Sequence, residues 1–382
     1  MRVAVISESF LPQVNGVTNS VCRLLDHLAA NGHEALVIAP DPGPASYAGF
    51  PVVATPALAL PFYRDFRAGL PSRLVLRTLR RFRPDIIHLA SPAVLGASGI
   101  RAASRLGIPV VAVFQTDLVG FARQYGLRVA GPFIWRRLRA IHGAAARTLA
   151  PSSATLNELR ANGIPRLARW GRGVDLTGFH PGRRSDALRE ELAPGGEVVV
   201  GYVGRVAADK RVHLLAGVAD IPGVRLVVVG DGPAREALGK LIPRAVFTGL
   251  KTGSALHELV ASFDVFVHPG GNETFSQAVQ EALASGVPVV AAAAGGPLDL
   301  VRDGRTGLLY KADEPAAMRG AVERLVADAD LRRRMGEAAR ASVEDRTWNA
   351  VCAELLTHYR EVLLETDARD DLVLTDGQGR ET

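Results

Sequence analysis

Cysteine, lysine and aromatic residues are all scarce in this chain of 382 residues. The two cysteines, Cys22 and Cys352, fall on apolar faces of predicted helices. They exclude a disulfide framework and favour reduced thiols in the core. Aromatic residues make up 6% of the chain and apolar residues 48%, which is typical of an α/β protein rich in Ala, Val and Leu.

Long hydrophobic runs are absent as well. No apolar run approaches the roughly 20 residues that a membrane-spanning helix requires. Residues 2–6 read as a strand, and no signal-peptide pattern surrounds them. We therefore expect a cytoplasmic protein, and peripheral contact with the inner face of the plasma membrane stays open.

Arginine carries nearly all of the positive charge, because lysine occurs only at positions 210, 240, 251 and 311. The net charge is +6, and two arginine clusters lie in the first half. Solvated helix faces, an anionic membrane surface or nucleic acid could each explain them, in that order of preference. No aromatic platform or nucleic-acid motif accompanies them, so we expect no nucleic-acid partner. The clusters are Arg73, Arg77, Arg80, Arg81 and Arg83, and then Arg136, Arg137 and Arg139.

Predicted strands and helices alternate along the whole chain, which indicates an α/β protein with parallel sheets covered by helices on both faces. Ligands of such sheets bind beyond the carboxyl ends of the strands. The strands are expected at 2–7, 34–39, 85–89, 109–114 and 147–150, and then at 198–203, 224–229, 245–248, 264–268, 287–291 and 307–309.

The length of the chain favours two domains, and the polar stretch that follows Gly173 is the expected linker. Two sheets joined in this way are predicted to form a cleft that holds the ligand. We predict an N-terminal domain over 1–178, a second domain over 179–346, a C-terminal helix over 347–365 and a disordered tail over 366–382.

Glu273 and Glu281 lie eight residues apart on a segment with helical periodicity, and Phe275 begins its apolar stripe. Thr274 and Ser276 are expected to cap the helix. Glu281 then lies about two turns beyond Glu273, roughly 12 Å along the axis. That span suits a nucleotide-sugar, with the helix N–H groups facing its diphosphate. Two solvated glutamates on a surface helix are an equally open alternative.

A pair of cations follows the first strand of the second half. Strand 198–203 leads into Gly204 and Arg205, and Lys210 comes five residues later. Two cations at the end of one strand can bind one diphosphate, although a surface ion pair between Lys210 and Asp209 is the alternative. Gly249 and Leu250 end a neighbouring strand and are expected to border a base.

The first half carries weaker signals. Gly16 lies between strand 2–7 and a helix over 17–30, where it could let the backbone approach an anion. A tight turn that needs glycine is the alternative. Gln115 and Asp117 follow strand 109–114 and face the predicted cleft, but residues in such positions are as often loop anchors.

Two motifs for other chemistry are incomplete. Gly230 and Gly232 begin a dinucleotide fingerprint, but Arg235 occupies the place of its third glycine, which argues against an NAD-dependent oxidoreductase. Asp328 and Asp330 form an Asp-x-Asp pair in a helical region outside the predicted cleft. No cluster of His, Cys and Asp has the spacing of metal ligands, so we expect neither a metal nor another cofactor.

Taken together, these residues resemble the retaining GT-B glycosyltransferases of family 4 over about residues 1–362. The E-x7-E motif of that family corresponds to Glu273 and Glu281, its phosphate pair to Arg205 and Lys210, and its glycine loop to Gly16. The segments 8–21, 88–92, 115–117 and 172–175 are similar to the GDP-mannose-dependent α-mannosyltransferases of actinobacteria that act on glycolipids.

The resemblance implies a GT-B fold, in which two Rossmann-like domains face a central cleft and the last helix crosses back to the first domain. It implies transfer of a hexose, mannose from GDP-mannose, to a glycolipid or lipid-linked acceptor. A UDP-sugar donor, as in sulfoquinovosyl or glucosyl lipid synthesis, or a soluble saccharide acceptor is the nearer alternative. A nucleotide-sugar epimerase or an oxidoreductase is more distant.

The resemblance also assigns roles to individual residues. Arg205 and Lys210 would stabilise the leaving phosphate, Glu273 would hold the sugar and Glu281 the ribose. Many relatives have histidine where this chain has Gln115, so Gln115 or Asp117 must take that place. The expected donor-binding residues are Gly16, Gly204, Arg205, Lys210, Gly249, Leu250, Glu273, Thr274, Phe275, Ser276 and Glu281.

Overall fold

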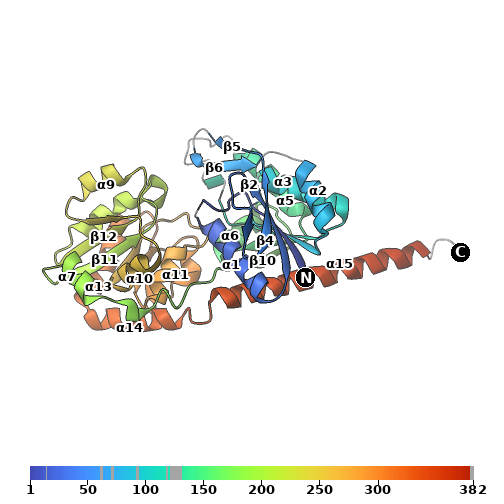
Figure 1. Cartoon of the computed structure of the whole chain (residues 1–382). Helices are drawn as coiled ribbons and strands as arrows, with labels where there is room; N and C mark the ends of the chain where they lie inside the picture. The colour runs from blue at the N-terminus through green and yellow to red at the C-terminus, as the bar shows by residue number, and fades with distance from the viewer. Residues whose placement is uncertain are drawn as a thin grey trace. The chain divides into compact units, whose positions relative to one another are not determined.

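The structure is a computed structural model that describes residues 1–13, 15–60, 63–69, 73–91, 94–117, 119–120 and 131–378. It divides into two compact units, shown in Figure 1. Unit 1 comprises Met1–Pro151, Thr155–Gly171 and Val351–Thr382, and unit 2 comprises Ser152–Ala154 and Arg172–Ala350.

Unit 1 is built on an eight-stranded sheet with the order β10-β9-β8-β7-β1-β2-β4-β3. Neighbouring strands pair in parallel, except that β3 and β4 are antiparallel. A separate antiparallel hairpin joins β5 and β6. The strands are β1 (Arg2–Ile6), β2 (Glu34–Pro40), β3 (Ser46–Tyr47), β4 (Phe50–Thr55), β5 (Ala57–Leu60), β6 (Tyr63–Gly69), β7 (Ile86–Leu89), β8 (Val110–Val113), β9 (Arg147–Ala150) and β10 (Leu167–Arg169).

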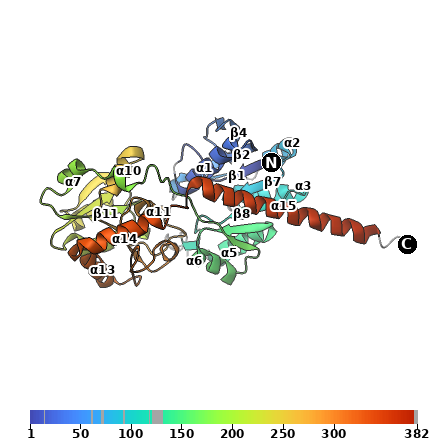
Figure 2. The ribbon, with the colours of Figure 1, turned by 90° about the horizontal axis from the view of Figure 1, so that it is seen from below.

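Helices cover both faces of this sheet, because its central strands are apolar on both sides. In β1, Val3 and Val5 point into a core with α1 and α15, whereas Ala4 and Ile6 point into a core with α2, α3 and α5. Figure 2 shows α15 running along strands β1, β7 and β8. The helices are α1 (Gly16–Ala30), α2 (Arg73–Phe82), α3 (Val94–Leu106), α5 (Gly131–Ala144), α6 (Ser153–Ala161) and α15 (Trp348–Gln378).

The C-terminal helix is bound to unit 1 by apolar packing and by buried hydrogen bonds. The indole Nε1 of Trp170 donates to the Val351 carbonyl over 2.9 Å, and the Tyr359 hydroxyl lies 2.7 Å from Nδ1 of His88. The structure carries this helix on to Gln378, which differs from the disordered tail expected over 366–382. Residues 366–376 contain neither proline nor glycine, so nothing in them ends a helix that has already formed.

Unit 2 contains a fully parallel six-stranded sheet with the order β13-β12-β11-β14-β15-β16. All six of its strands were expected from the sequence within one or two residues. The strands are β11 (Val198–Val203), β12 (Val224–Val229), β13 (Val246–Gly249), β14 (Val265–His268), β15 (Val289–Ala292) and β16 (Gly307–Tyr310).

Helices also cover both faces of the second sheet. One core packs α7, α10 and α11 on the sheet, and the other packs α8, α9 and α13. These elements are α7 (Asp186–Leu192), α8 (Ala216–Ala219), α9 (Arg235–Leu241), α10 (Gly253–Ala261), α11 (Gln277–Ala284), α12 (Pro297–Leu300), α13 (Pro315–Ala327) and α14 (Ala329–Ala341), with the short 3-10 helices η2 (Pro181–Arg183), η3 (Ala208–Lys210) and η4 (Val212–Leu215).

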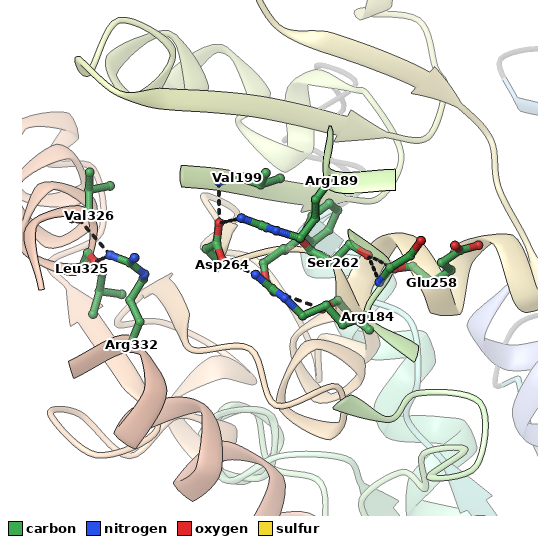
Figure 3. A network of polar contacts seen from close by, with 12 residues as sticks. Arg184, Arg189, Val199, Glu258, Ser262, Asp264, Leu325, Val326 and Arg332 are labelled. Carbon is green, nitrogen blue, oxygen red and sulfur yellow. Dashed lines mark hydrogen bonds and ion pairs between the residues drawn. The ribbon is translucent and has the colours of Figure 1, made fainter. Parts of the chain in front are cut away.

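A charged network fixes the start of β14. Asp264 accepts from the Val199 amide over 2.8 Å and pairs with Arg184 at 2.8 Å and Arg189 at 3.0 Å (Figure 3). Arg189 also donates to the Ser262 carbonyl over 2.8 Å. Charge-assisted bonds of this kind are the stronger class of protein hydrogen bond. The network therefore anchors the start of β14, at the end opposite to His268.

The boundary between the units lies earlier than predicted, since unit 2 begins at Arg172 and not after 178. The segment that follows Gly171 is tied to unit 2 by its backbone. Gln280 donates to the Arg172 carbonyl and Gln277 to the Gly173 carbonyl, each over 3.0 Å. A boundary read from composition alone does not register such bonds.

Strands β3, β4 and β10 and the hairpin of β5 and β6 were not expected. Strand β4 is mostly half-buried and contains Pro51, whereas β10 has three residues and none of them is buried. Short, half-exposed strands at the edge of a sheet lack the apolar pattern that marks central strands.

Candidate functional site

The loop after β11 carries the predicted pair of cations. Arg205 forms an ion pair with Asp209 at 2.6 Å, and its carbonyl accepts from the buried hydroxyl of Tyr202 over 2.9 Å. Lys210 ends the 3-10 turn η3, and Arg211 follows in the left-handed region with φ of 53°. The surface pair between Lys210 and Asp209 is not formed, because Asp209 binds Arg205.

Lys210 is instead paired with Glu273. Its Nζ lies 2.6 Å from Oε1 of Glu273, and the two side chains are 27% and 15% exposed. Burial raises the pKa of Glu273, but the Lys210 charge and a hydrogen bond from His268 outweigh it and lower the pKa to about 2. The structure thus joins two predicted site residues that are 63 positions apart.

Three further groups lie around this pair. Nε2 of the buried His268, at the end of β14, lies 3.5 Å from Oε1 of Glu273 and 3.3 Å from the Ser276 hydroxyl. The Tyr202 hydroxyl is near enough to Glu273, Asp209 and Arg205 for their charges to shift its pKa, which burial raises. The ends of β11 and β14 therefore gather two cations and two carboxylates in one place.

The start of α11 differs from the expected cap. The helix begins at Gln277, so Glu273 and Thr274 lie in the preceding loop, and only Glu281 is on the helix. The 12 Å estimate along one axis does not apply. Ser276 occupies the N-cap position with φ of 79°, and its hydroxyl makes no capping bond. A non-glycine residue in this region costs about 1–2 kcal/mol, so the surrounding structure must hold Ser276 there.

Glu281 lies on α11 and is partly buried. Burial raises its pKa to about 8, although a hydrogen bond from Gln277 opposes the shift. Near pH 7 its carboxyl therefore carries a proton and can donate a hydrogen bond. Phe275, by contrast, is buried in the core of unit 2 at 5% exposure, so it supports the loop from inside.

Glycines of two turns pack against the loops that follow β11 and β14, a role that the sequence pattern did not indicate. A Cβ on Gly230 would lie 2.0 Å from the Gly204 carbonyl oxygen, and one on Gly296 would lie 1.9 Å from that of Phe275. Gly230 and Gly204 have φ of 130° and 155°. The incomplete dinucleotide fingerprint is thus a turn that supports the loop after β11.

Two predicted base-bordering residues follow the same sheet edge. The Gly249 carbonyl accepts from the Gly230 amide over 2.8 Å, and Leu250 is 75% exposed. An exposed leucine at the end of this edge strand offers an apolar surface for a flat ring.

In unit 1, Gly16 is the first residue of α1. Asn15 caps this helix by accepting from the amides of Val17 and Thr18 over 2.9 Å and 3.0 Å. Asn15 also donates to the Ser9 hydroxyl over 2.6 Å. These bonds fix the helix start at the carboxyl end of β1.

Gln115 and Asp117 have local partners. Gln115 is 7% exposed and donates to the Ala90 carbonyl over 3.2 Å. Asp117 accepts from the Gly120 amide over 2.7 Å. Both contacts match the loop-anchor alternative, and neither distinguishes it from a role next to a substrate.

Glu8 is a charged residue that the sequence analysis did not single out. It follows β1, is 1% exposed and accepts from the amides of Leu95 and Gly96 at the start of α3. Burial raises its pKa from the ordinary value of 4.5 to about 7, although these backbone hydrogen bonds oppose the shift. Only the fold brings Glu8 and α3 together, because 87 residues separate Glu8 from Leu95.

The Asp-x-Asp pair of Asp328 and Asp330, which was not expected to bind a metal, has a structural role at Asp328. Asp328 caps α14 by accepting from the Leu331 amide over 2.8 Å. Among the residues that the structure describes, no cluster of His, Cys, Asp and Glu could hold a metal ion. Within the same residues, no helix combines the length and apolarity needed to cross a membrane.

Comparison with known proteins agrees with this organisation. Residues 14–177 match the family described as Glycosyltransferase Family 4, and residues 184–342 match Glycosyl transferases group 1. A GDP-mannose-dependent alpha-mannosyltransferase of Mycolicibacterium smegmatis is 52% identical over 95% of this chain and 98% of its own length. A protein of the same name from Mycobacterium tuberculosis is 50% identical over 95% and 97%.

A solved structure gives the same picture of the fold. Sucrose-phosphate synthase from Thermosynechococcus elongatus superposes with a TM-score of 0.77 at 21% identity, over 95% of this chain and 99% of that chain. The expected class, an α/β fold of the GT-B type with two Rossmann-like units, is confirmed.

Proposed function

The chain belongs to glycosyltransferase family 4, and we propose that it transfers mannose from GDP-mannose to a glycolipid with retention at the anomeric carbon. The observation that carries this proposal is the 52% identity, over 95% of the chain, to a protein named for GDP-mannose-dependent α-mannosyl transfer. The grouping of Lys210, Arg205 and Glu273 in unit 2 supports it, since an activated sugar needs cations at its phosphates and acceptors at its hydroxyls.

The chemical barrier is the departure of GDP while positive charge grows on the sugar ring. Arg205 and Lys210 would bind the diphosphate, and the N–H groups at the start of α11 would face it. Fixed donors of this kind act where charge develops in the transition state. We propose that they do so without a metal ion, and that the departing phosphate accepts the proton of the attacking hydroxyl.

The remaining residues would position the two substrates. Glu273 would accept from the sugar hydroxyls, and Glu281, protonated near pH 7, would donate to the ribose. Thr274 and Ser276 would line the diphosphate, and the exposed side chain of Leu250 would pack on the base. Gly16 would bind the donor, and Gln115 or Asp117 would contact the acceptor.

A thermal-shift screen of nucleotide-sugars tests the donor. A ligand at 100 times its Kd adds about 2.7 kcal/mol of stability, so GDP-mannose should raise the melting temperature clearly. A shift with UDP-glucose or UDP-sulfoquinovose and none with GDP-mannose would replace the donor proposed here. A shift with NAD alone would remove the glycosyl-transfer proposal.

We also propose that unit 1 docks on an anionic membrane. The arginines of α2 and α5 are exposed, and α5 adds Phe133 with 62% exposure. A basic helix with an exposed aromatic ring suits the surface of an anionic bilayer. Co-sedimentation with liposomes should rise with phosphatidylglycerol content and fall for the triple variant R77Q/R80Q/R81Q. Binding that is independent of anionic lipid would refute the docking.

A further inference from the structure

His268 has no role in the function proposed above, yet it contacts the centre of the candidate site. It ends β14, its side chain is 6% exposed, and its ring is stacked on Phe266 with 6.5 Å between the centroids. Its Nε2 faces Oε1 of Glu273, whereas its Nδ1 is buried without a hydrogen-bond partner among the described residues. A buried histidine held in this way is a means of orienting a neighbour.

The contacts favour one tautomer of His268. With the proton on Nδ1, a buried N–H would lack an acceptor, and the lone pair of Nε2 would face the Glu273 carboxylate. With the proton on Nε2, the ring donates toward Glu273 and only a lone pair is left unpaired. The second arrangement avoids both costs, so Nε2 is the donor.

Lys210 and His268 both contact Oε1 of Glu273. The Nζ of Lys210 lies 2.6 Å from this oxygen, and Nε2 of His268 lies 3.5 Å from it. In the proposed reaction the diphosphate draws the charge of Lys210 away from Glu273. Among the residues that the structure describes, His268 alone then still holds that carboxylate. We propose that His268 is a positioning residue that keeps Glu273 directed at the sugar once Lys210 has engaged the phosphates, an inference that rests on the proposed function.

Ser276 completes this arrangement. Its hydroxyl lies 3.3 Å from Nε2 of His268. The backbone of Ser276 has a φ of 79° at this position, which serine rarely adopts. The hydroxyl thus faces the ring from the start of α11, while Glu273 faces the same nitrogen from the loop. His268 thereby links the loop and the helix on which the proposed donor site depends.

Kinetics of two His268 variants test the inference. Gln places its amide nitrogen close to the position of Nε2 and can donate, whereas Leu cannot. His268→Leu should lower kcat/KM for GDP-mannose about tenfold or more and lower the affinity for GDP much less, because GDP lacks the mannose that Glu273 would hold. His268→Gln should restore most of the activity. Equal failure of both variants, or an equal loss of GDP affinity in His268→Leu, would overturn the assignment.

A matched control separates this role from general damage to a core. His142 is a buried histidine of unit 1 that contacts Thr148 at 3.1 Å. His142→Leu should lower the melting temperature without changing the ratio of GDP-mannose to GDP affinity. A change of that ratio in His142→Leu would show that the readout is not specific to the site.

A second measurement needs no substrate. In urea unfolding, His268→Leu should lower the midpoint more in the wild-type background than in Glu273→Leu, because leucine offers no acceptor to His268 and the contact exists only in the former. Equal shifts in both backgrounds would overturn the positioning contact. If the wild type fails to use GDP-mannose although the urea midpoints shift by different amounts in the two backgrounds, the proposed function is wrong. In that case the contact between His268 and Glu273 stands.

Discussion

Lys210 and Glu273 neutralise each other at the candidate donor site, and this pairing explains why two charged side chains can be largely buried there. The cation lowers the pKa of the carboxyl to about 2 against the effect of burial. In the proposed reaction a diphosphate would replace Glu273 as the partner of Lys210, and until then the pair spares Lys210 the larger cost of an unpaired buried charge.

Lys210→Ala should lower kcat about 10²–10³-fold, the usual cost of one fixed donor to developing charge. The measurement is steady-state transfer of mannose, with circular dichroism to check the fold. Lys240→Ala is the matched control, because Lys240 is 75% exposed and, within the described part of the chain, pairs with Glu236 alone, on its own helix. Near-normal turnover of Lys210→Ala would contradict the role assigned to Lys210.

Asp209→Asn should tighten the binding of GDP. Asp209 holds Arg205 at 2.6 Å, and a half-exposed pair of this kind is worth about 0.2–1 kcal/mol. Its removal should lower the Kd for GDP by up to about fivefold, measured by calorimetry. Asp231→Asn removes the same charge without freeing Arg205, and an equal gain there would show that net charge alone is responsible.

Glu8→Gln should remove a pH dependence of stability. The pKa of Glu8 is raised from 4.5 to about 7 in the folded protein. Its stabilising contribution is therefore complete below pH 4.5 and is lost as the pH rises through 7. At pH 8 the variant should be more stable than the wild type by up to about 3 kcal/mol, and at pH 4.5 the gap should close. Urea unfolding at pH 4.5 and pH 8 measures this difference in stability. The control is Glu34→Gln, because the side chain of Glu34 is exposed. An equal gap at both values would contradict the assignment.

At the scale of elements, the carboxyl ends of β11 and β14 hold the site, and neighbouring turns hold the loops that follow them. The Gly230 turn packs on the loop after β11, and the Gly296 turn packs on the loop after β14. Both contacts are backbone on backbone, so neither turn tolerates a side chain.

Gly296→Ala should cost about 10²-fold in transfer, because its Cβ would lie 1.9 Å from the Phe275 carbonyl oxygen and would displace the Glu273 loop. Gly239→Ala is the control, since no atom within 4 Å meets its Cβ in α9. That change should stabilise the protein by about 0.5–1 kcal/mol. Normal activity of Gly296→Ala in an initial-rate assay would show that the bracing is not needed.

The elements that could be predicted are those whose local pattern determines their structure. The central parallel strands are apolar on both faces, and α1 has an apolar face between an Asn cap and Gly32, so both were expected. Ser276 shows where such reading ends. Serine and a following apolar stripe predict an N-cap, and Ser276 occupies that position, but its hydroxyl faces His268 and not the helix amides, and its backbone lies in the left-handed region.

At the scale of the whole molecule, each unit has its own sheet and its own cores, and α15 returns the chain from unit 2 to unit 1. The helix was expected to return to the first domain, while its length and the boundary at Arg172 were not. Motif spacing predicted Lys210 and Glu273 as separate site residues, and only the fold shows that they form a pair at 2.6 Å. The cleft predicted between the domains stays a prediction.

Product analysis tests the central claim most directly. The purified protein is incubated with GDP-mannose and a glycolipid acceptor, and the product is examined by NMR at the anomeric carbon. We expect an α-mannosylated lipid, formed with retention by the wild type and about 10²–10³-fold more slowly by Lys210→Ala. A β-linked product, an epimerised sugar nucleotide without transfer, or equal rates for the two proteins would contradict the proposed reaction.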